Sequence, residues 1–449
     1  PQTFGLLAMI AALTEILEQI KDFGLSSATI QRTDITHEQV SALFWINSAI
    51  GVAVALALFA GAPYLADFYG QPELTEITRW LALAFVISGA TTQHWALLRR
   101  QMRFRTVASI DVGAEVFGMA TAVVAALAGA GIWALVAQRL ASSAAVMLAT
   151  WSTSHWRPGW PRRCAGLKSL LVFGGSMTGH GIIHILVRNI DQVLIGWYWG
   201  PLQLGLYERA YKLLMSPTNT VTVPLYSVGM PALSRLQEDP ERYRRTYLLL
   251  SEKLAMLSVP AAALMIATAD WIVALLLGAQ WHDAAPILAW LGVAAALMPV
   301  AVTTGLLLVT QDRTPELLKF GMLGATIGIA AILIGLPFGP VGVAASFALS
   351  TTFVRVPICF WLAGRKGPVT VADLFESIAP SVVAGCAVFA AVFAFRHLAP
   401  VQSASPIMAL LLCACVTLAV AATCFVCIPR SRRALLSMAH LSRRLFSYQ

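Results

Sequence analysis

Charged side chains are scarce in this sequence. Asp, Glu, Lys and Arg make up 12% of its 449 residues, whereas a typical soluble domain carries about 25%. This scarcity excludes an ordinary soluble protein, because a water-exposed surface needs more charge. The chain is instead 58% hydrophobic, and its apolar runs are repeatedly about 20 residues long, enough to cross a hydrocarbon core of about 30 Å. The composition therefore predicts a protein that crosses a membrane many times.

The motifs of common enzymes are absent from the sequence as well. It contains no Gly-rich phosphate loop with Lys, no His-Glu-x-x-His motif and no credible nucleophile elbow. The seven Cys residues are odd in number and lack the spacing of zinc ligands, so we interpret them as small buried apolar residues. We therefore expect a protein that is not an enzyme and that needs no cofactor or metal.

Apolar runs between Gly, Pro and charged breaks predict an all-α fold with thirteen membrane spans and no soluble domain. The expected spans are 4–23, 40–66, 75–98, 106–128, 131–152, 168–198, 203–233, 245–277, 284–309, 316–336, 340–363, 372–395 and 404–428.

Most of the 31 Lys and Arg residues fall in every second connection between these spans. Basic loops stay in the cytoplasm, so we expect these connections and the C-terminal tail there. The other connections contain only Arg79 and Arg396, at span edges. The basic residues do not gather on one soluble face, which argues against binding to nucleic acid.

An internal repeat relates the two halves of the chain. "PQTFGLLA" (1–8) and "PLQLGLYE" (201–208) share Pro, Gly and Leu at an offset of 200, and "QMRFR" (101–105) occupies the place of "QDRTP" (311–315). The repeat predicts two pseudo-symmetric six-helix lobes in the same orientation. A span precedes Pro201, so we expect one before Pro1 that is missing from this chain. The expected domains are an N-lobe with five of six helices (1–154), a C-lobe with six (166–367), and two additional helices with a basic tail (370–449).

Longer stretches carry a resemblance to a known family. "DFGLSSATIQR" (22–32), "FWINSAIG" (44–51), "RNIDQVLIGWYWGPLQLGLYERAYKL" (188–213) and "LLGAQWHDAAPILAWL" (276–291) resemble bacterial polysaccharide transporters. These are the Wzx-type O-antigen and exopolysaccharide flippases of the multidrug/oligosaccharidyl-lipid/polysaccharide exporter superfamily. The resemblance implies two lobes around a central cavity and alternating access. It also implies movement of an undecaprenyl-diphosphate-linked oligosaccharide across the bacterial inner membrane, with membrane lipids, a polysaccharide polymerase and the export machinery as partners.

Ionisable groups inside the spans are the candidate substrate-binding residues, because a charge at the bilayer centre costs about 2.5–3.5 kcal/mol on insertion scales. His180, His184, Arg188 and Asp191 share one helix face, which we expect to line a hydrated cavity. The resemblance gives Arg188 the diphosphate as ligand, and the alternative is an ion pair with Asp191 or a contact that locks the two lobes together. Proton coupling, sugar contact and packing all remain open for the two histidines. Further cavity candidates are Arg209, Lys212, Arg139 and Arg355.

Acidic residues inside the spans are candidates for ion coupling. Glu15, Glu18 and Asp22 share one helix face, and Asp111 and Glu115 lie one turn apart. For the first three, pairing at the helix end with Lys21 or a neighbouring lobe is the alternative.

Two other functions stay open. A cation-coupled multidrug exporter of the same superfamily would favour an acidic, aromatic cavity over a mixed basic one. A membrane polymerase or glycosyltransferase would need a long extracytoplasmic loop, and the longest expected one is short, near 67–74.

Overall fold

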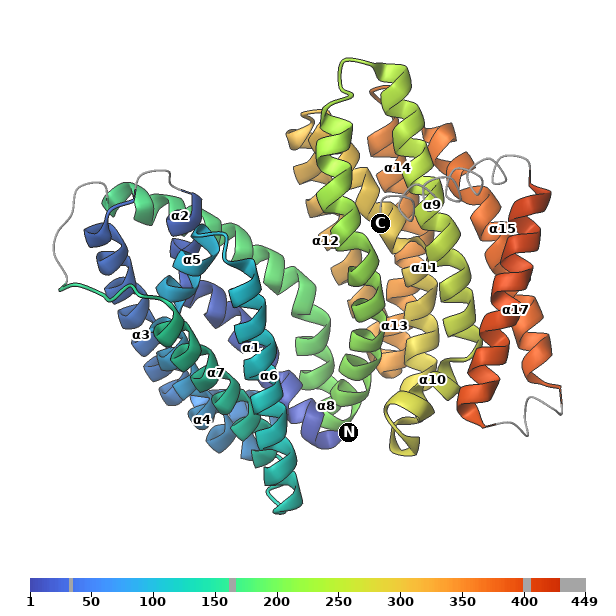
Figure 1. The fold of residues 1–449 in the computed structure, drawn as a ribbon. Coiled ribbons are helices and arrows are strands. Elements are labelled where there is room, and N and C mark those ends of the chain that lie inside the picture. Colours follow the sequence, from blue (N-terminus) through green and yellow to red (C-terminus); the bar gives the residue numbers. More distant parts are fainter. Residues whose placement is uncertain (32–34, 161–166, 399–404, 429–449) are drawn as a thin grey trace. The chain divides into compact units, whose positions relative to one another are not determined.

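A computed structural model describes residues 1–31, 35–160, 167–398 and 405–428 (Figure 1). All regular structure in these ranges is helical. Eight of the described helices are long and apolar enough to span a membrane, or nine if a bent pair is counted as one span. The prediction of an all-α polytopic membrane protein is confirmed.

The chain divides into two compact units, Gln2–Leu202 and Gln203–Gln449. The first unit contains α1 (Gln2–Asp22), α2 (Leu25–Gln31), α3 (His37–Tyr69), α4 (Glu73–Gly89), α5 (Thr92–Arg100), α6 (Phe104–Leu127), α7 (Trp133–Thr153) and the first part of α8 (Leu167–Ser234). The segment expected to begin the C-lobe is therefore grouped by packing with the first unit. The lobe boundaries drawn from the repeat, and the symmetry itself, stay predictions.

The long helix α3 shows how the sequence sets helix ends. Thr36 caps its start, because the Thr36 side chain accepts a hydrogen bond from the Gln39 backbone N (3.2 Å) and the Gln39 side chain accepts one from the Thr36 N (3.1 Å). Gly70 ends the helix with a φ of 63°, a left-handed conformation that Gly adopts without steric cost. Its ends thus follow from local sequence signals.

The helix α1 ends at Asp22, and α2 follows after a short break at Phe23 and Gly24. Phe23 and Gly24 both have positive φ, 45° and 61°, so the helical ladder stops there. Asn47 of α3 donates hydrogen bonds to the freed carbonyls of Lys21 (3.0 Å) and Asp22 (3.1 Å). Backbone carbonyls that lose their helical partner in this way need another donor.

A second break separates α4 from α5, which are bent by 43°. Trp151 of α7 donates a hydrogen bond from Nε1 to the Ala90 carbonyl at this bend (3.0 Å). The short helices α2 and α5 pack against each other.

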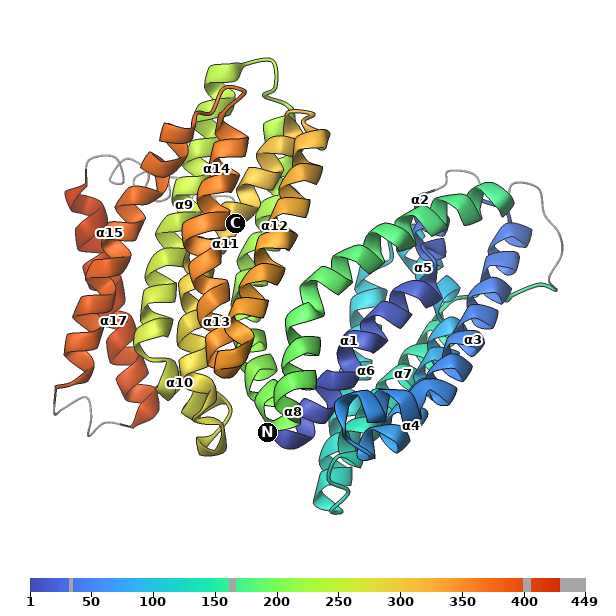
Figure 2. The same cartoon turned by 180° about the vertical axis from the view of Figure 1, so that it is seen from behind.

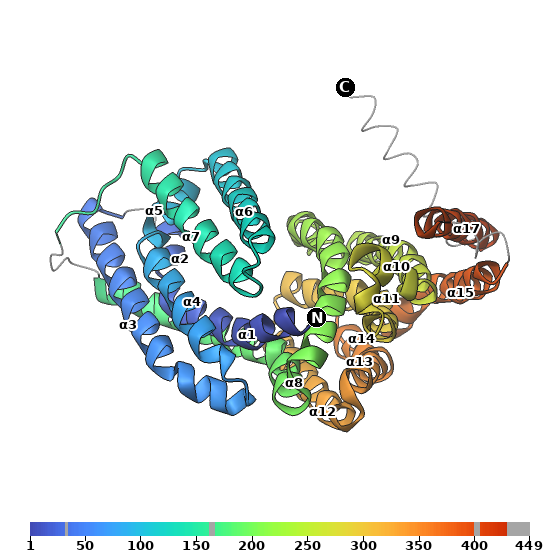
Figure 3. The same ribbon diagram turned by 90° about the horizontal axis from the view of Figure 1, so that it is seen from below.

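The second unit contains the second part of α8 and the helices that follow it (Figure 2). These are α9 (Pro240–Ala267), α10 (Ala269–Leu276), η1 (Ala279–Trp281), α11 (Ala284–Thr310), α12 (Thr314–Gly335), η2 (Leu336–Phe338), α13 (Gly339–Ser350), the π-helical turn η3 (Thr351–Arg355), α14 (Val356–Gly364), α15 (Val371–Arg396) and α17 (Pro406–Cys427). Viewed along the helices, α15 and α17 lie at one edge of this unit (Figure 3).

The structure corrects three expectations about the spans. The segment expected at 245–277 is not one helix, because α9 ends at Ala267 and α10 follows as a separate helix. The connection that contains α10 and η1 (268–283) is consequently longer than the stretch at 67–74. The spans expected at 168–198 and 203–233 meet without a loop, since only Gly200, with φ 79° and ψ −177°, interrupts α8.

Two ion pairs fasten α15 to the rest of the second unit. At its start, Arg244 of α9 donates from Nε to Oδ2 of Asp373 (2.8 Å). At its end, Arg396 pairs with Asp270 of α10 (2.6 Å). Between these ends α15 packs along α9, so the expected additional helices are an integral part of this unit.

Candidate functional site

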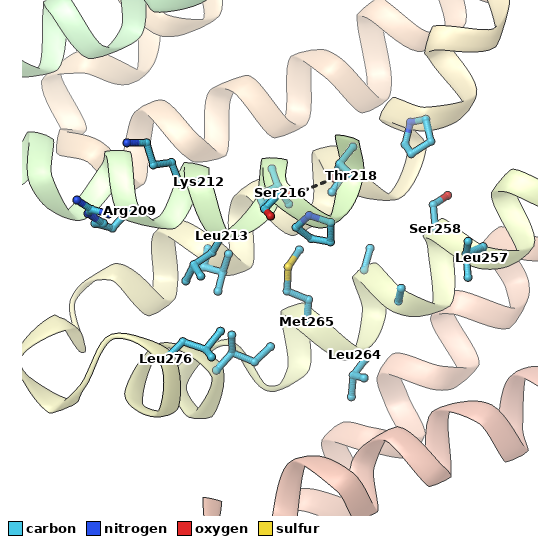
Figure 4. Close-up of a pocket in the computed structure, with 18 of the residues that line it drawn as sticks. Arg209, Lys212, Leu213, Ser216, Thr218, Leu257, Ser258, Leu264, Met265 and Leu276 are labelled. Carbon is cyan, nitrogen blue, oxygen red and sulfur yellow. Dashed lines mark hydrogen bonds between the residues drawn. The ribbon is translucent and has the colours of Figure 1, made fainter. Parts of the chain in front are cut away.

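An apolar pocket of about 660 Å³ lies in the second unit, between the second part of α8 and the helices α9, α10 and α11 (Figure 4). Its wall consists largely of Leu, Met, Ile, Ala and Pro, including Leu213 of α8, Met265 of α9 and Leu276 of α10. Ligand sites commonly have volumes of about 300–1,000 Å³ and a mostly apolar lining with a few polar groups. The size and lining of this pocket suit a hydrocarbon chain.

The amphipathic pattern of α8 determines which side chains face this pocket. Tyr207, Ala210 and Leu214 are at most 1% exposed and pack inside the unit. Arg209 and Lys212 are more exposed, with 28% and 63% of their side chains accessible, and both line the pocket together with Leu213 and Leu214.

Two basic side chains therefore lie at one end of an apolar wall. Figure 4 shows Arg209 and Lys212 close together at the same end of the drawn segment of α8. Both are next to Glu208, which is buried. Lys212 forms an ion pair with Oε1 of Glu208, and Nε of Arg209 lies 3.4 Å from Oε2. One carboxylate therefore contacts two cations.

This combination suits an amphiphile with an anionic head. Guanidinium and ammonium groups bind phosphate oxygens through charge-assisted hydrogen bonds, and the Lys212 side chain is 63% exposed. The apolar wall can bury a hydrocarbon tail next to them, which is favourable in proportion to the area removed from water.

The other basic candidates do not line this pocket. Arg355 belongs to η3, and its guanidinium packs against Gly324 of α12, where an added Cβ would lie 3.1 Å from Nε. Arg139 is exposed on α7 in the first unit. Of the basic candidates for substrate binding, Arg209 and Lys212 are thus the two that line the described pocket.

The face that was expected from 180 to 191 is described only at Asp191. Asp191 is buried, and its Oδ1 accepts a hydrogen bond from the Gln192 backbone N (2.8 Å). The side chains of His180, His184 and Arg188 lie outside the described residues. The roles assigned to them stay predictions.

The acidic residues of α1 have different partners. Glu15 accepts a hydrogen bond from Nδ2 of Asn189 in α8 (2.8 Å). Glu18 pairs with Lys21 at 2.7 Å, which is the helix-end pairing considered from the sequence. Asp22 accepts from the Ser26 hydroxyl (2.7 Å) at the start of α2. Glu15 is therefore the member of this group whose side chain forms a described hydrogen bond with another span.

The two acidic residues of α6 have different environments although they lie one turn apart. Asp111 is half-buried and Glu115 is exposed. Among the described residues, no group of three or more His, Cys, Asp or Glu side chains is arranged to hold a metal ion.

Neutral polar residues form a buried network that the sequence analysis missed. Asn47, Gln93 and Thr29 are all 0% exposed. Gln93 donates from Nε2 to Oδ1 of Asn47 (2.7 Å), and the Thr29 hydroxyl donates to Oε1 of Gln93 (2.8 Å). The signal in the sequence is an uncharged amide or hydroxyl within each apolar segment, which stands out less than an ionisable group.

Comparisons with known proteins agree with this architecture. A family model described as "Polysaccharide biosynthesis protein" matches residues 1–286. The chain is 27% identical over 349 residues to the lipopolysaccharide biosynthesis protein WzxC of Escherichia coli (strain K12), covering 77% of this chain and 71% of the relative. It is 28% identical over 298 residues to the succinoglycan biosynthesis transport protein ExoT of Rhizobium meliloti (strain 1021), covering 66% of this chain and 60% of the relative.

The fold is also similar to a solved structure, that of the lipid II flippase MurJ in an inward closed conformation. The TM-score is 0.71 at 13% sequence identity, over 95% of this chain and 93% of the other. At this identity the similarity establishes a shared fold.

Proposed function

Because the chain belongs to the family of polysaccharide biosynthesis proteins, we propose that it is a flippase for lipid-linked oligosaccharides. Its substrate is an oligosaccharide repeat unit attached through a diphosphate to a polyprenyl chain of the undecaprenyl type, used for exopolysaccharide, capsule or O-antigen. The relatives support this proposal, since one is named as a transport protein of succinoglycan biosynthesis and a protein of the same fold is named as a lipid II flippase.

The observation that carries the proposal is the position of Arg209 and Lys212 beside an apolar wall. A lipid diphosphate has two parts with opposite requirements, an anionic group and a long hydrocarbon chain. The two basic side chains bind the diphosphate oxygens, while the wall around Leu213 and Met265 shelters the first part of the chain. Glu208 holds both cations in place and limits their net charge, so that the substrate can leave again.

Transport in this proposal proceeds by alternating access without an enzymatic step. The N-lobe and the C-lobe expose the bound diphosphate to one side of the membrane and then to the other. Arg188, Asp191, His180 and His184 stay proposed contacts of the substrate along its path, together with Arg139 and Arg355. Glu15 is the proposed ion-coupling group, with Glu18, Asp22, Asp111 and Glu115 as further candidates.

The protein is a multi-pass membrane protein, and we place it in the bacterial inner membrane with its C-terminus in the cytoplasm. The alternation of basic connections supports this orientation. Single cysteines at Gln71 and Gln203 should then react with an impermeant thiol reagent added outside the cells, whereas cysteines at Arg235 and Arg365 should be protected. A polysaccharide polymerase and the export machinery are proposed partners.

A binding measurement tests the substrate class. The full chain in detergent micelles is offered polyprenyl diphosphate, polyprenyl monophosphate and the neutral polyprenol, and the lipids retained are measured by native mass spectrometry. We expect the diphosphate to be retained best, and Arg209→Gln with Lys212→Gln to remove this preference. Equal retention of all three lipids by the unmodified chain would contradict the proposal.

A further inference from the structure

A second cavity lies in the first unit, between α3 and α4, and has a volume of about 440 Å³. Its apolar lining includes Val52, Leu56 and Phe59 of α3 and Trp80, Leu83 and Val86 of α4. These six side chains are between 39% and 65% exposed. In a chain that spans a membrane, such an exposed apolar groove faces hydrocarbon, and its volume is within the range of about 300–1,000 Å³ that ligand sites have.

The groove also contains one cation and one carboxylate. The Arg79 guanidinium lies over the Phe59 ring, 5.2 Å from its centroid, and its Nη1 is 3.5 Å from Oε1 of Glu76. The Arg79 side chain is 36% exposed, so the outer part of its guanidinium can reach a phosphate group, which guanidinium binds well.

Arg79 is unusual for its place in the sequence. Most Lys and Arg residues lie in the connections that we expect in the cytoplasm. The connections expected on the other side of the membrane contain only Arg79 and Arg396, each at the edge of a span. Arg396 is used within the protein, where it pairs with Asp270 and stacks near Trp271. Arg79, by contrast, is next to a groove that opens along the helices.

The order of groups along the groove matches one class of lipid. The helix α4 begins at Glu73, so Glu76 is outermost, Arg79 lies about 4.5 Å deeper, and Val86 lies about 10 Å deeper again at 1.5 Å per residue. A phospholipid with a primary amine in its headgroup has its ammonium outermost, then its phosphate, then its acyl chains. Glu76 would meet the ammonium, Arg79 the phosphate, and the apolar wall an acyl chain.

We propose that the α3–α4 groove is a binding site for a zwitterionic aminophospholipid of the phosphatidylethanolamine type. Phosphatidylglycerol fits less well, because its headgroup places no cation at the Glu76 carboxylate. A polyprenyl diphosphate brings additional negative charge to the same carboxylate. The site is distinct from the pocket at Arg209, and the proposal does not depend on the transported substrate.

Native mass spectrometry of the full chain with added phosphatidylethanolamine, phosphatidylcholine and phosphatidylglycerol tests this proposal. We expect the first lipid to be retained best, because its ammonium can donate hydrogen bonds to Glu76. Arg79→Gln should lower its retention about fivefold, since a charge-assisted contact to the phosphate is lost. Glu76→Gln should remove the preference over phosphatidylglycerol. The control Arg105→Gln makes the same change at an exposed position of α6 and should leave retention unaltered.

A second variant tests the groove without altering its charges. Leu56→Trp fills the apolar part at a position that is 65% exposed, so the fold should tolerate it. We expect this variant to lose the lipid although Glu76 and Arg79 are intact. Equal retention of the three phospholipids by the unmodified chain would overturn the proposal, as would unchanged retention in Arg79→Gln and Leu56→Trp. Displacement of the lipid by an equal amount of polyprenyl monophosphate would overturn it too.

Discussion

Asn189 donates a hydrogen bond to Glu15 across 174 residues of sequence, with 2.8 Å between Nδ2 and Oε2. The amide is buried and the carboxylate is exposed. This contact joins α1 to α8, so Glu15, the proposed ion-coupling group, lies where two helices meet.

This geometry leads to a prediction about coupling. Glu15→Gln keeps a side chain that can accept from Asn189 but removes the charge, so transport should lose most of its dependence on an imposed ion gradient. Initial rates of lipid movement in vesicles with and without the gradient measure this. Glu38→Gln, at an exposed position in the first turn of α3, should keep the dependence. A Glu15→Gln protein that responds to the gradient like the unmodified chain would remove Glu15 from the coupling mechanism.

Filling the pocket of the second unit should block transport. Ala261 lines the pocket and is exposed to it, so Ala261→Trp places an indole where we expect the polyprenyl chain. We expect transport to fall roughly tenfold or more, equivalent to the loss of about 1.4 kcal/mol of binding. The matched control is Ala330→Trp, at an exposed position of α12. Equal transport by both variants at equal membrane levels would contradict a role for this pocket.

The network at Asn47 should contribute to stability. Asn47→Ala leaves the carbonyls of Lys21 and Asp22 and the amide of Gln93 without their partner, and an unsatisfied buried group costs about 1–3 kcal/mol. The melting temperature of the purified protein should fall by several degrees. Thr121→Ala removes an exposed hydroxyl that bonds only to the Phe117 carbonyl of its own helix, so it should have little effect. If Asn47→Ala and Thr121→Ala have the same melting temperature, the network does not contribute to stability.

Two ion pairs formed by arginines of α9, one with Asp373 at the start of α15 and one with Asp239, can be compared for their effect on stability. Arg244→Gln leaves Asp373, whose side chain is 9% exposed, without its guanidinium, and should destabilise the protein by about 1 kcal/mol. Arg242→Gln removes an exposed pair with Asp239, whose atoms are 3.8 Å apart, and should cost less than about 0.5 kcal/mol. Thermal unfolding followed by tryptophan fluorescence measures the stability of both variants. A larger loss of stability in Arg242→Gln than in Arg244→Gln would show that the pair at Asp373 is not the more important one.

Much of the helical architecture could be predicted from the sequence because lipid demands long apolar runs. The span expected at 40–66 is α3, and the one at 372–395 is α15. The close association of Arg209 and Lys212 also follows from helical spacing. Positions at a break between two helices are harder to predict, since Gly24 is a recognisable signal but Phe23 adopts positive φ only because surrounding contacts compensate for it.

The wall of the candidate site could not be predicted. Met265 and Leu276 are ordinary apolar residues in the sequence, and only the packing of α9 and α10 beside α8 brings them to Arg209. The contact between Asn189 and Glu15 was missed for another reason. The charged groups at 188 and 191 stand out in the sequence, whereas the neutral amide of Asn189 between them reaches the carboxylate.

The most direct test of the central proposal measures lipid movement itself. The full chain is reconstituted into vesicles that contain a fluorescent oligosaccharide linked by a diphosphate to a polyprenyl chain, and the label exposed outside is quenched over time. We expect the unmodified chain to move the lipid, the Arg209→Gln/Lys212→Gln protein to move it roughly tenfold more slowly, and Lys319→Gln, an exposed cation of α12, to match the unmodified chain. Movement at the full rate by the double variant, or no movement by the unmodified chain, would contradict the account.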